Sequence, residues 1–167
     1  MSLVQVARQT ITSPVSSLSI TGISTDDAYL LTLNNVVAGT ANARLELRFT
    51  ESGTANTTSN YDKADVFIAS SGKSNNYATN QTYINIFGNQ PTSNYTCGLL
   101  YIYNANNSSE HTFCTFEQTG WDNGAVVGGR QGGGTFTVTS QVDGVNLFMG
   151  NTGGTINAGT FTLYKVI

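Results

Sequence analysis

The sequence predicts an all-β protein of about eight to eleven antiparallel strands with essentially no helix. Three observations predict this fold class. Short segments that alternate apolar and polar residues recur at spacings of roughly ten to fifteen residues. The segments between them are rich in Gly, Asn and Ser, which favour turns. No ten-residue window spaces its apolar residues with a helical period.

The composition indicates one folded, β-rich domain over residues 1–167, because a chain of 17.7 kDa can bury a sizeable core. Charged residues make up only 10% of the chain, while Thr, Ser, Asn and Gly number 24, 15, 18 and 18. Intrinsic disorder combines low hydrophobicity with high charge. This chain has little charge and carries eight Tyr and eight Phe, so disorder is not expected.

The first half of the chain contains four predicted strands. "SLVQVARQTI" alternates from its first residues, and we expect residues 1–12 to form a terminal arm or an edge strand. "SSLSITGI" follows, and "AYLLTLNNVV" is apolar on both faces, as expected of an interior strand. "ARLELRFTE" is the clearest case. It should turn Leu45, Leu47 and Phe49 to one face and Arg44, Glu46 and Arg48 to the other.

The second half supplies the remaining predicted strands: "ADVFIA", "TYINIFG", "GLLYIYN", "TFCTFEQ", "GTFTVTSQ", "VNLFMG" and "GTFTLYKVI". "SSGKSNNYATNQ" and "WDNGAVVGGRQGGG" are expected to be turn-rich connections. A chain of about eight to eleven strands without helices can form a two-sheet sandwich, a jelly roll or a barrel. The sparse charge along the expected edge strands favours an oligomer whose neighbouring copies cover those edges.

The two cysteines lie in a predicted hairpin, "CGLLYIYNANNSSEHTFCTFEQ". A turn centred on Ala105–Asn106 would place Cys97 opposite Cys114, and a slip of the turn by one or two residues would break that pairing. In a reducing cytoplasm two free thiols are the favoured alternative. Two cysteines are also too few for a disulfide scaffold or a structural zinc site.

The charge distribution argues against a nucleic-acid partner. The net charge is −3, the isoelectric point is near 4.8, and the seven Lys and Arg residues are scattered. No apolar run has the length of a membrane span, so no membrane partner is expected. The N-terminal segment lacks the charge pattern of a secretory signal, which predicts that the protein is made and folded in a cytoplasm.

The sequence shows no constellation of catalytic or metal-binding residues. His111 is the only histidine, and Cys114, three residues away on a strand, would point to the opposite face. The carboxylates do not have calcium-loop spacing, so solvated loop acids are favoured over a surface calcium site. We therefore predict no catalytic residue, no metal site and no cofactor, and expect that the protein is not an enzyme.

Four aromatic residues fall in polar, turn-like segments: Tyr61, Tyr77, Tyr95 and Trp121. Three roles remain open for them. They can fold their loops back onto the sandwich, anchor an interface, or stack on sugars.

Two segments resemble a family of tailed-phage structural proteins. "ITSPVSSLSITGISTDDAYLLTLNNVVAGTANARLELRFTESGT" is similar to the opening of these proteins, and "GTINAGTFTLYKV" resembles their common ending, with Lys165 where glycine is frequent. The similarity is firm over residues 11–53 and 150–167. It implies a jelly-roll-like β-sandwich on the exterior of a virion, often as a homotrimer.

Within this family two functions compete. A capsid cement or decoration protein bridges capsomers, and its partners are the major capsid protein and copies of itself. The alternative is a tail-fibre or receptor-binding head domain that recognises host-surface glycans; a free-standing interaction module is a third. The strand pattern begins almost at the first residue, which favours cement. For that role we predict capsid or subunit contacts by Val4, Val6, Arg8 and Ile11.

Overall fold

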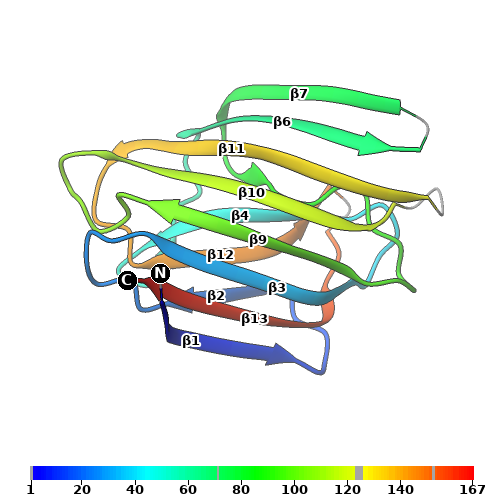
Figure 1. The fold of residues 1–167 in the computed structure, drawn as a ribbon, viewed down its shortest axis with the longest axis horizontal. Coiled ribbons are helices and arrows are strands. Elements are labelled where there is room, and N and C mark those ends of the chain that lie inside the picture. The colour runs from blue at the N-terminus through cyan, green and yellow to red at the C-terminus, as the bar shows by residue number, and fades with distance from the viewer. Residues whose placement is uncertain (1, 71, 123–125, 152) are drawn as a thin grey trace.

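The computed structural model describes residues 2–70, 72–122, 126–151 and 153–167. These residues form thirteen strands and no helix, and the strands build two antiparallel sheets packed face to face (Figure 1). The prediction of an all-β sandwich is therefore confirmed. In the described part of the chain, no helix has the length and apolarity needed to cross a membrane.

The large sheet has eight strands in the order β1-β13-β3-β9-β10-β11-β6-β7. Their bounds are β1 Leu3–Ile11, β13 Ile156–Val166, β3 Tyr29–Ala38, β9 Thr96–Tyr103, β10 His111–Trp121, β11 Val127–Thr139, β6 Tyr61–Ala69 and β7 Gly72–Gln81. The small sheet has the order β2-β12-β4-β5, and β8 also pairs with β4. Its strands are β2 Ser17–Thr21, β12 Gly144–Gly150, β4 Arg44–Glu51, β5 Thr54–Ala55 and β8 Ile84–Asn85.

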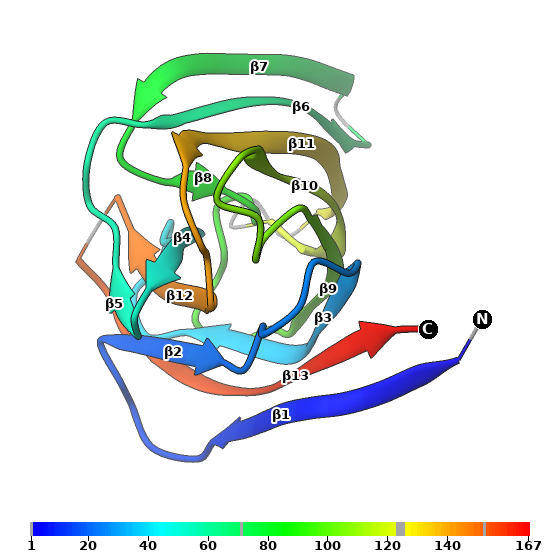
Figure 2. The ribbon, with the colours of Figure 1, turned by 90° about the vertical axis from the view of Figure 1, so that its left-hand side faces the viewer.

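The pairing follows a jelly-roll pattern. The first strand pairs with the last (β1 with β13), β2 pairs with β12, β3 with β9 and β4 with β5, and successive pairs alternate between the two sheets. The chain is thus one long antiparallel hairpin wrapped into two layers. The strands β10, β11, β6 and β7 then extend the large sheet beyond β9. Figure 2 shows this sheet curling around the small one, with β1 and β13 along the bottom and β6 and β7 along the top.

The core lies between the two sheets and is built by alternation along the strands. Leu45, Leu47 and Phe49 of β4 are fully buried, as predicted, while Arg44 is exposed. Glu46 belongs to the outer row but is nonetheless buried, because β8 pairs across from it. The inward row of β3 and β13 adds large apolar side chains to the same core: Leu31, Leu33, Phe161 and Leu163.

Both ends of the described chain are fixed in the large sheet. The backbone N–H of Ser2 donates to the carbonyl of Ile167 at 2.8 Å, and the N–H of Ile167 donates back at 3.0 Å. Strand β1 lies along β13 and forms one edge of the sheet. The apolar C-terminal strand is therefore covered on both sides by β1 and β3 and is protected from fraying.

Two segments expected to be connections contain strands, so the predictions are wrong for residues 72–81 and 127–134; residues 123–125 of the second segment lie outside the described residues. Residues 72–81 form β7, which pairs with β6 at the edge of the sheet and lies largely in solvent, so its sequence shows no apolar alternation. "GGRQGGG" lies inside β11. Its glycines allow a close approach of neighbouring elements: a Cβ added at Gly134 would lie 2.7 Å from Cδ1 of Ile84.

The predicted β9–β10 hairpin exists, but its predicted register is wrong. Cys97 lies opposite Thr119, and Cys114 lies opposite Ile102, so the two thiols are free and do not face each other. The turn lies further along the chain than expected, between Tyr103 at the end of β9 and His111 at the start of β10. Within it, the side-chain amide of Asn107 donates to Asp26 at 3.0 Å. Burial raises the pKa of the Cys114 thiol to about 12.

Candidate functional site

The outer face of the large sheet carries a continuous apolar and aromatic surface. Within this surface, side chains paired across neighbouring strands form two rows that run across the sheet. In one row Tyr164, Leu30 and Tyr101 lie side by side across β13, β3 and β9. In the next, Leu3 pairs with Val166, and Tyr103 pairs with Phe113. Together with one further side chain these residues define the outer patch: Leu3, Leu30, Leu99, Tyr101, Tyr103, Phe113, Tyr164 and Val166.

The outer patch exists because several strands are apolar on both faces. In β9, Leu100 and Ile102 are buried in the core, while Tyr101 and Tyr103 alternate with them and point outward. An antiparallel sandwich usually presents polar residues on its outer faces. Large contiguous apolar patches on protein surfaces are typical of interaction sites, which makes this face a candidate for one.

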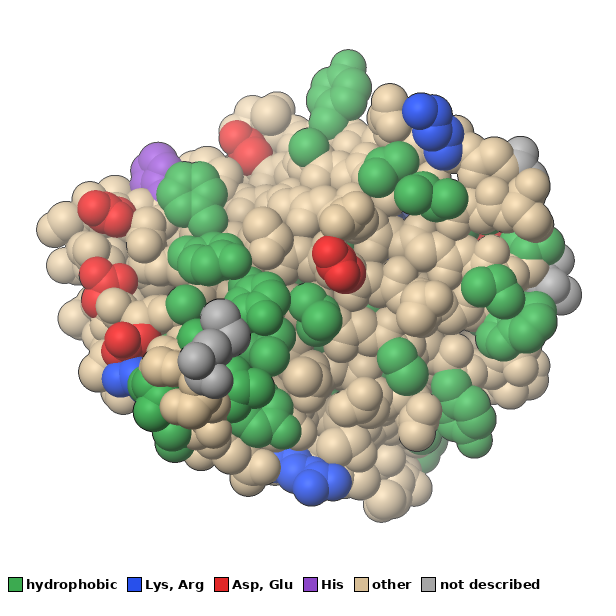
Figure 3. All heavy atoms as spheres, in the orientation of Figure 1, with side chains coloured by type: hydrophobic (Ala, Val, Ile, Leu, Met, Phe, Trp, Pro, Cys, Tyr) green, Lys and Arg blue, Asp and Glu red, His purple; other side chains and the backbone are tan. Residues whose placement is uncertain are grey.

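Several side chains of the outer patch pack against one another. The rings of Tyr101 and Tyr103 stack with centroids 6.4 Å apart. Leu30 is only 8% exposed although it points away from the core, because tyrosines flank it on both neighbouring strands. Phe113 remains 46% exposed. Figure 3 shows hydrophobic side chains gathered on the left half of this face, with most charged side chains around them rather than among them.

The free edges of the large sheet carry little charge. The edge strand β1 contains one charged residue, Arg8, and the opposite edge strand β7 contains one, Lys73. Natural sheets commonly protect their edges with several charges, prolines or bulges. The edge of β1 has one register irregularity between Gln5 and Ala7. Both edges are therefore suited to contact with another protein surface.

The four predicted N-terminal contact residues divide into two groups. Val4 and Arg8 are exposed on β1. Val6 and Ile11 are partly buried and pack against the core, so their first role is to hold β1 on the sandwich. A contact function for Val4 and Arg8 stays a prediction.

The four predicted contact aromatics lie on different elements. Tyr77 is 85% exposed on β7, Tyr95 is exposed between β8 and β9, and Trp121 is exposed at the end of β10. Tyr61 is fully buried, so the prediction of a surface contact is wrong for this residue. It begins β6 rather than lying in a loop. Its hydroxyl donates to the carbonyl of Asn56 and accepts the N–H of Phe49.

A buried polar network, which the sequence analysis did not predict, lies at the far end of the large sheet. Arg130 of β11 forms two hydrogen bonds of 2.8 Å to the carboxylate of Asp65 of β6. The Arg130 guanidinium also donates to Asn85 of β8, and Asn76 of β7 donates to Asp65 at 3.0 Å. The only signal in the sequence was charge inside two otherwise apolar or glycine-rich strands.

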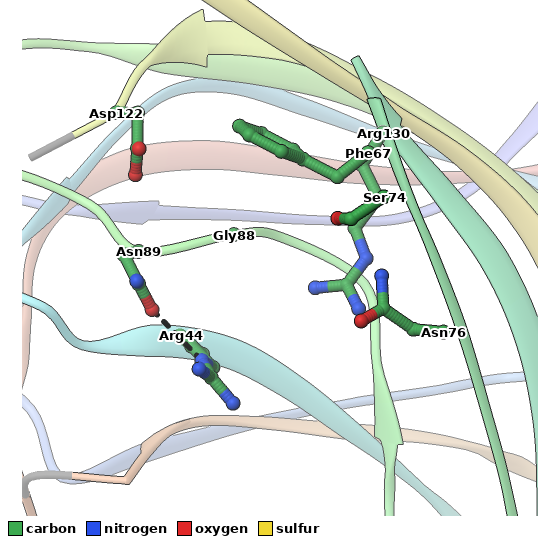
Figure 4. Close-up of a pocket in the computed structure, with 8 residues that line it drawn as sticks. All are labelled: Arg44, Phe67, Ser74, Asn76, Gly88, Asn89, Asp122 and Arg130. Atoms are coloured by element: carbon green, nitrogen blue, oxygen red, sulfur yellow. Dashed lines mark hydrogen bonds between the residues drawn. The ribbon is translucent and has the colours of Figure 1, made fainter. Parts of the chain in front are cut away.

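The Arg130 network borders a polar cleft of about 160 Å³. Arg130, Asn76, Ser74 and Phe67 line one side, from β11, β7 and β6 (Figure 4). The other side is formed by Arg44, Gly88, Asn89 and Asp122. The Nε of Arg44 donates to Oδ1 of Asn89 at 2.8 Å, drawn as the dashed line in Figure 4.

Two further ionisable groups lie near this network. Burial raises the pKa of Glu46 on β4 and lowers the pKa of Lys63 on β6. Within the described residues, no three His, Cys, Asp or Glu side chains come together as a metal site. His111 is exposed at the start of β10, and Cys114 is buried with its side chain on the opposite face.

Comparison with models of known protein families and with curated proteins finds no match for this chain.

Proposed function

We propose that the protein is a non-enzymatic structural protein of a phage virion: a capsid cement protein that assembles as a homotrimer and bridges capsomers. The virion context rests on the sequence resemblance, which covers both ends of the chain. The observation that carries the adhesive role is the outer patch. It provides an apolar contact surface on the sheet face that also contains both chain ends.

The chemistry of the outer patch supports association with copies of the same chain. Its eight members carry no formal charge, so two such surfaces can approach without like-charge repulsion. Burying exposed aromatic side chains such as Phe113 and Tyr103 contributes about 25 cal/mol for each Å² of apolar area removed from water. Symmetric assembly then repeats each contact, and repeated contacts add through effective concentration.

The alternative function, a receptor-binding head of a tail fibre, would use exposed aromatic and polar side chains instead. The polar cleft and the exposed Trp121 are the features that favour it. The two functions differ in copy number. A cement protein should be present in hundreds of copies per particle, and heating particles that lack it should release DNA. A receptor-binding protein should be present in few copies.

The association step can be tested on the purified chain. We expect light scattering to give a trimer of the 17.7 kDa chain, and a variant carrying Tyr103→Ser and Phe113→Ser to be monomeric but folded. The matched control is Tyr95→Ser, which removes an aromatic ring outside the outer patch that is even more exposed than Tyr103 and Phe113. A wild-type monomer at high concentration, or a trimeric double variant, would contradict the proposed role of the patch.

A further inference from the structure

We propose that the polar cleft beside the Arg130–Asp65 pair binds a single neutral sugar unit, such as a hexose or the terminal hexose of a glycan. This inference rests on the cleft alone and is independent of the cement function. A volume of about 160 Å³ is smaller than the roughly 300–1,000 Å³ of pockets for drug-sized ligands, and it suits one small polar ring.

The charges of the cleft favour a neutral ligand. The guanidinium of Arg130 is neutralised by the buried carboxylate of Asp65, which it contacts with two nitrogens. The remaining charges on the lining are Arg44 and Asp122, which are opposite in sign. Among the described residues neither of these two takes part in an ion pair. The cleft as a whole therefore has no excess charge to attract an anion or a cation.

The side chains of the cleft are the kinds that bind hydroxyl groups. The amides of Asn76 and Asn89 and the carboxylate of Asp122 offer donors and acceptors to neighbouring hydroxyls. Hydrogen bonds to ionised groups such as Arg44 are stronger than bonds between neutral partners. The ring of Phe67 lies among these polar groups and offers an apolar surface to the C–H face of a sugar (Figure 4).

A second observation points to a ligand with hydroxyl groups. The cleft continues into a narrow recess that shares Phe67, Gly88, Asn89 and Asp122 with it and is also lined by Gln90. Gln90 is 1% exposed, and within the described residues neither atom of its side-chain amide has a hydrogen-bond partner. A buried amide without partners costs free energy. A hydroxyl group that enters the recess can satisfy both atoms by donating and accepting.

The strand pairing supplies a matched pair of variants. Asn76 lies opposite Asp65 and lines the cleft, whereas the adjacent Asn75 lies opposite Val66, on the other face of β7. Asn76→Ala removes a cleft amide, and Asn75→Ala removes the same group from the other face. A second cleft variant, Asp122→Asn, keeps the shape of the side chain and removes its charge.

The experiment titrates the full chain with methyl glycosides of glucose, galactose and mannose and with N-acetylglucosamine, and follows amide shifts by NMR. We expect one of these neutral sugars to shift residues of the cleft. We also expect Asn76→Ala and Asp122→Asn each to weaken that sugar about tenfold, which corresponds to 1.4 kcal/mol. Asn75→Ala should bind as the wild type does, and sialic acid should bind more weakly.

Three outcomes would overturn the proposal: no neutral sugar binds at millimolar concentration, Asn75→Ala weakens binding as much as Asn76→Ala does, or only the anionic sugar binds. Each variant is first compared with the wild type by its NMR spectrum, because Asn76 also contacts Asp65. If Asn76→Ala alters the fold, Asp122→Asn decides the outcome. None of these results depends on the oligomeric state or on virion incorporation, so the sugar site and the cement function can fail separately.

Discussion

The strands β6 and β11 pair along their whole shared length, yet their two ends are built from different chemistry. At one end Tyr61 and Phe136 lie opposite each other, with ring centroids 5.0 Å apart, and both contact Phe49 of the small sheet. At the other end the inward-facing residues are Asp65 and Arg130, joined as a buried ion pair. We call these the aromatic end and the ionic end.

The difference follows from what covers each end. Strand β4 places Phe49 over the aromatic end, and the three rings there exclude water. The ionic end is covered by the two-residue strand β8 and the segment after it, and it opens onto the polar cleft. An apolar contact stabilises without needing a specific partner, whereas a buried charge must be paired. The aromatic end therefore contributes stability, and the ionic end fixes the positions of cleft residues such as Asn76.

The largest effect is expected at the aromatic end. Phe136→Ala should reduce the free energy of unfolding by about 4 kcal/mol, because it removes a fully buried ring and leaves a cavity beside Tyr61 and Phe49. Urea denaturation would measure this loss of unfolding free energy. The control is Phe113→Ala on β10, which removes the same ring from the solvent-exposed face. In the monomeric state it should cost less than about 1 kcal/mol. Equal losses would contradict the contrast between buried and exposed rings.

The next largest effect is expected at the ionic end. Arg130→Met should reduce the free energy of unfolding by about 3 kcal/mol, because the carboxylate of Asp65 would stay buried without its cation. Urea denaturation of Arg130→Met and of a double variant that also carries Asp65→Leu would separate two causes of the loss: the missing ion pair itself, and the carboxylate of Asp65 left buried without a partner. We expect the double variant to recover most of the loss, since it leaves no buried charge unpaired. A double variant as unstable as Arg130→Met alone would show that the pair contributes net stability.

A smaller, pH-dependent effect is expected from Glu46, which lies close to the ionic end. Burial raises the pKa of its carboxyl group above the ordinary value of 4.5. Between the unfolded and folded pKa values the folded protein therefore holds more protons, and its stability falls as the pH rises through that window. Glu46→Gln should remove this decrease.

The measurement is the difference in unfolding free energy between Glu46→Gln and the wild type, followed from acid to neutral pH. We expect the difference to shift in favour of the variant as the pH rises. Glu51→Gln, which makes the same replacement on the same strand, controls for the loss of one carboxylate from the chain. A difference that shifts towards the wild type with rising pH would mean that ionised Glu46 is stabilised in the fold.

The same contrast explains which parts of the structure could be predicted from the sequence. Alternation in "ARLELRFTE" placed Leu45, Leu47 and Phe49 in the core correctly, because burial on one face leaves a period of two in the sequence. Strand β7 leaves no such signal, since it lies in solvent and is held by backbone pairing to β6. The glycines of β11 suggested a turn-rich connection, and only the neighbouring strands show why glycine is needed there.

The candidate sites were harder to predict than the core. Tyr61 was a candidate for an interface or sugar contact because polar residues surround it in sequence, but β6 begins at this residue and turns it inward, which leaves packing against the sandwich as its role. The outer patch depends on which apolar residues face outward, and this is set by the register of five strands, β1, β13, β3, β9 and β10. The polar cleft joins residues from Arg44 to Arg130. No local pattern relates segments so far apart in the chain.

The smallest effect on stability is expected from the ion pair between Lys165 and Asp27, which lies at the surface rather than in the interior. The Nζ of Lys165 on β13 lies 2.6 Å from the carboxylate of Asp27, but both side chains are partly exposed. The contact lowers the pKa of Asp27 and raises that of Lys165, so its stabilising contribution is present between the two titrations and is lost at either extreme of pH. Solvent and salt screen such a pair. Lys165→Gln should therefore leave the unfolding free energy unchanged within the error of urea denaturation at physiological salt. A loss comparable to that of Arg130→Met would mean that burial is not what separates the two ion pairs.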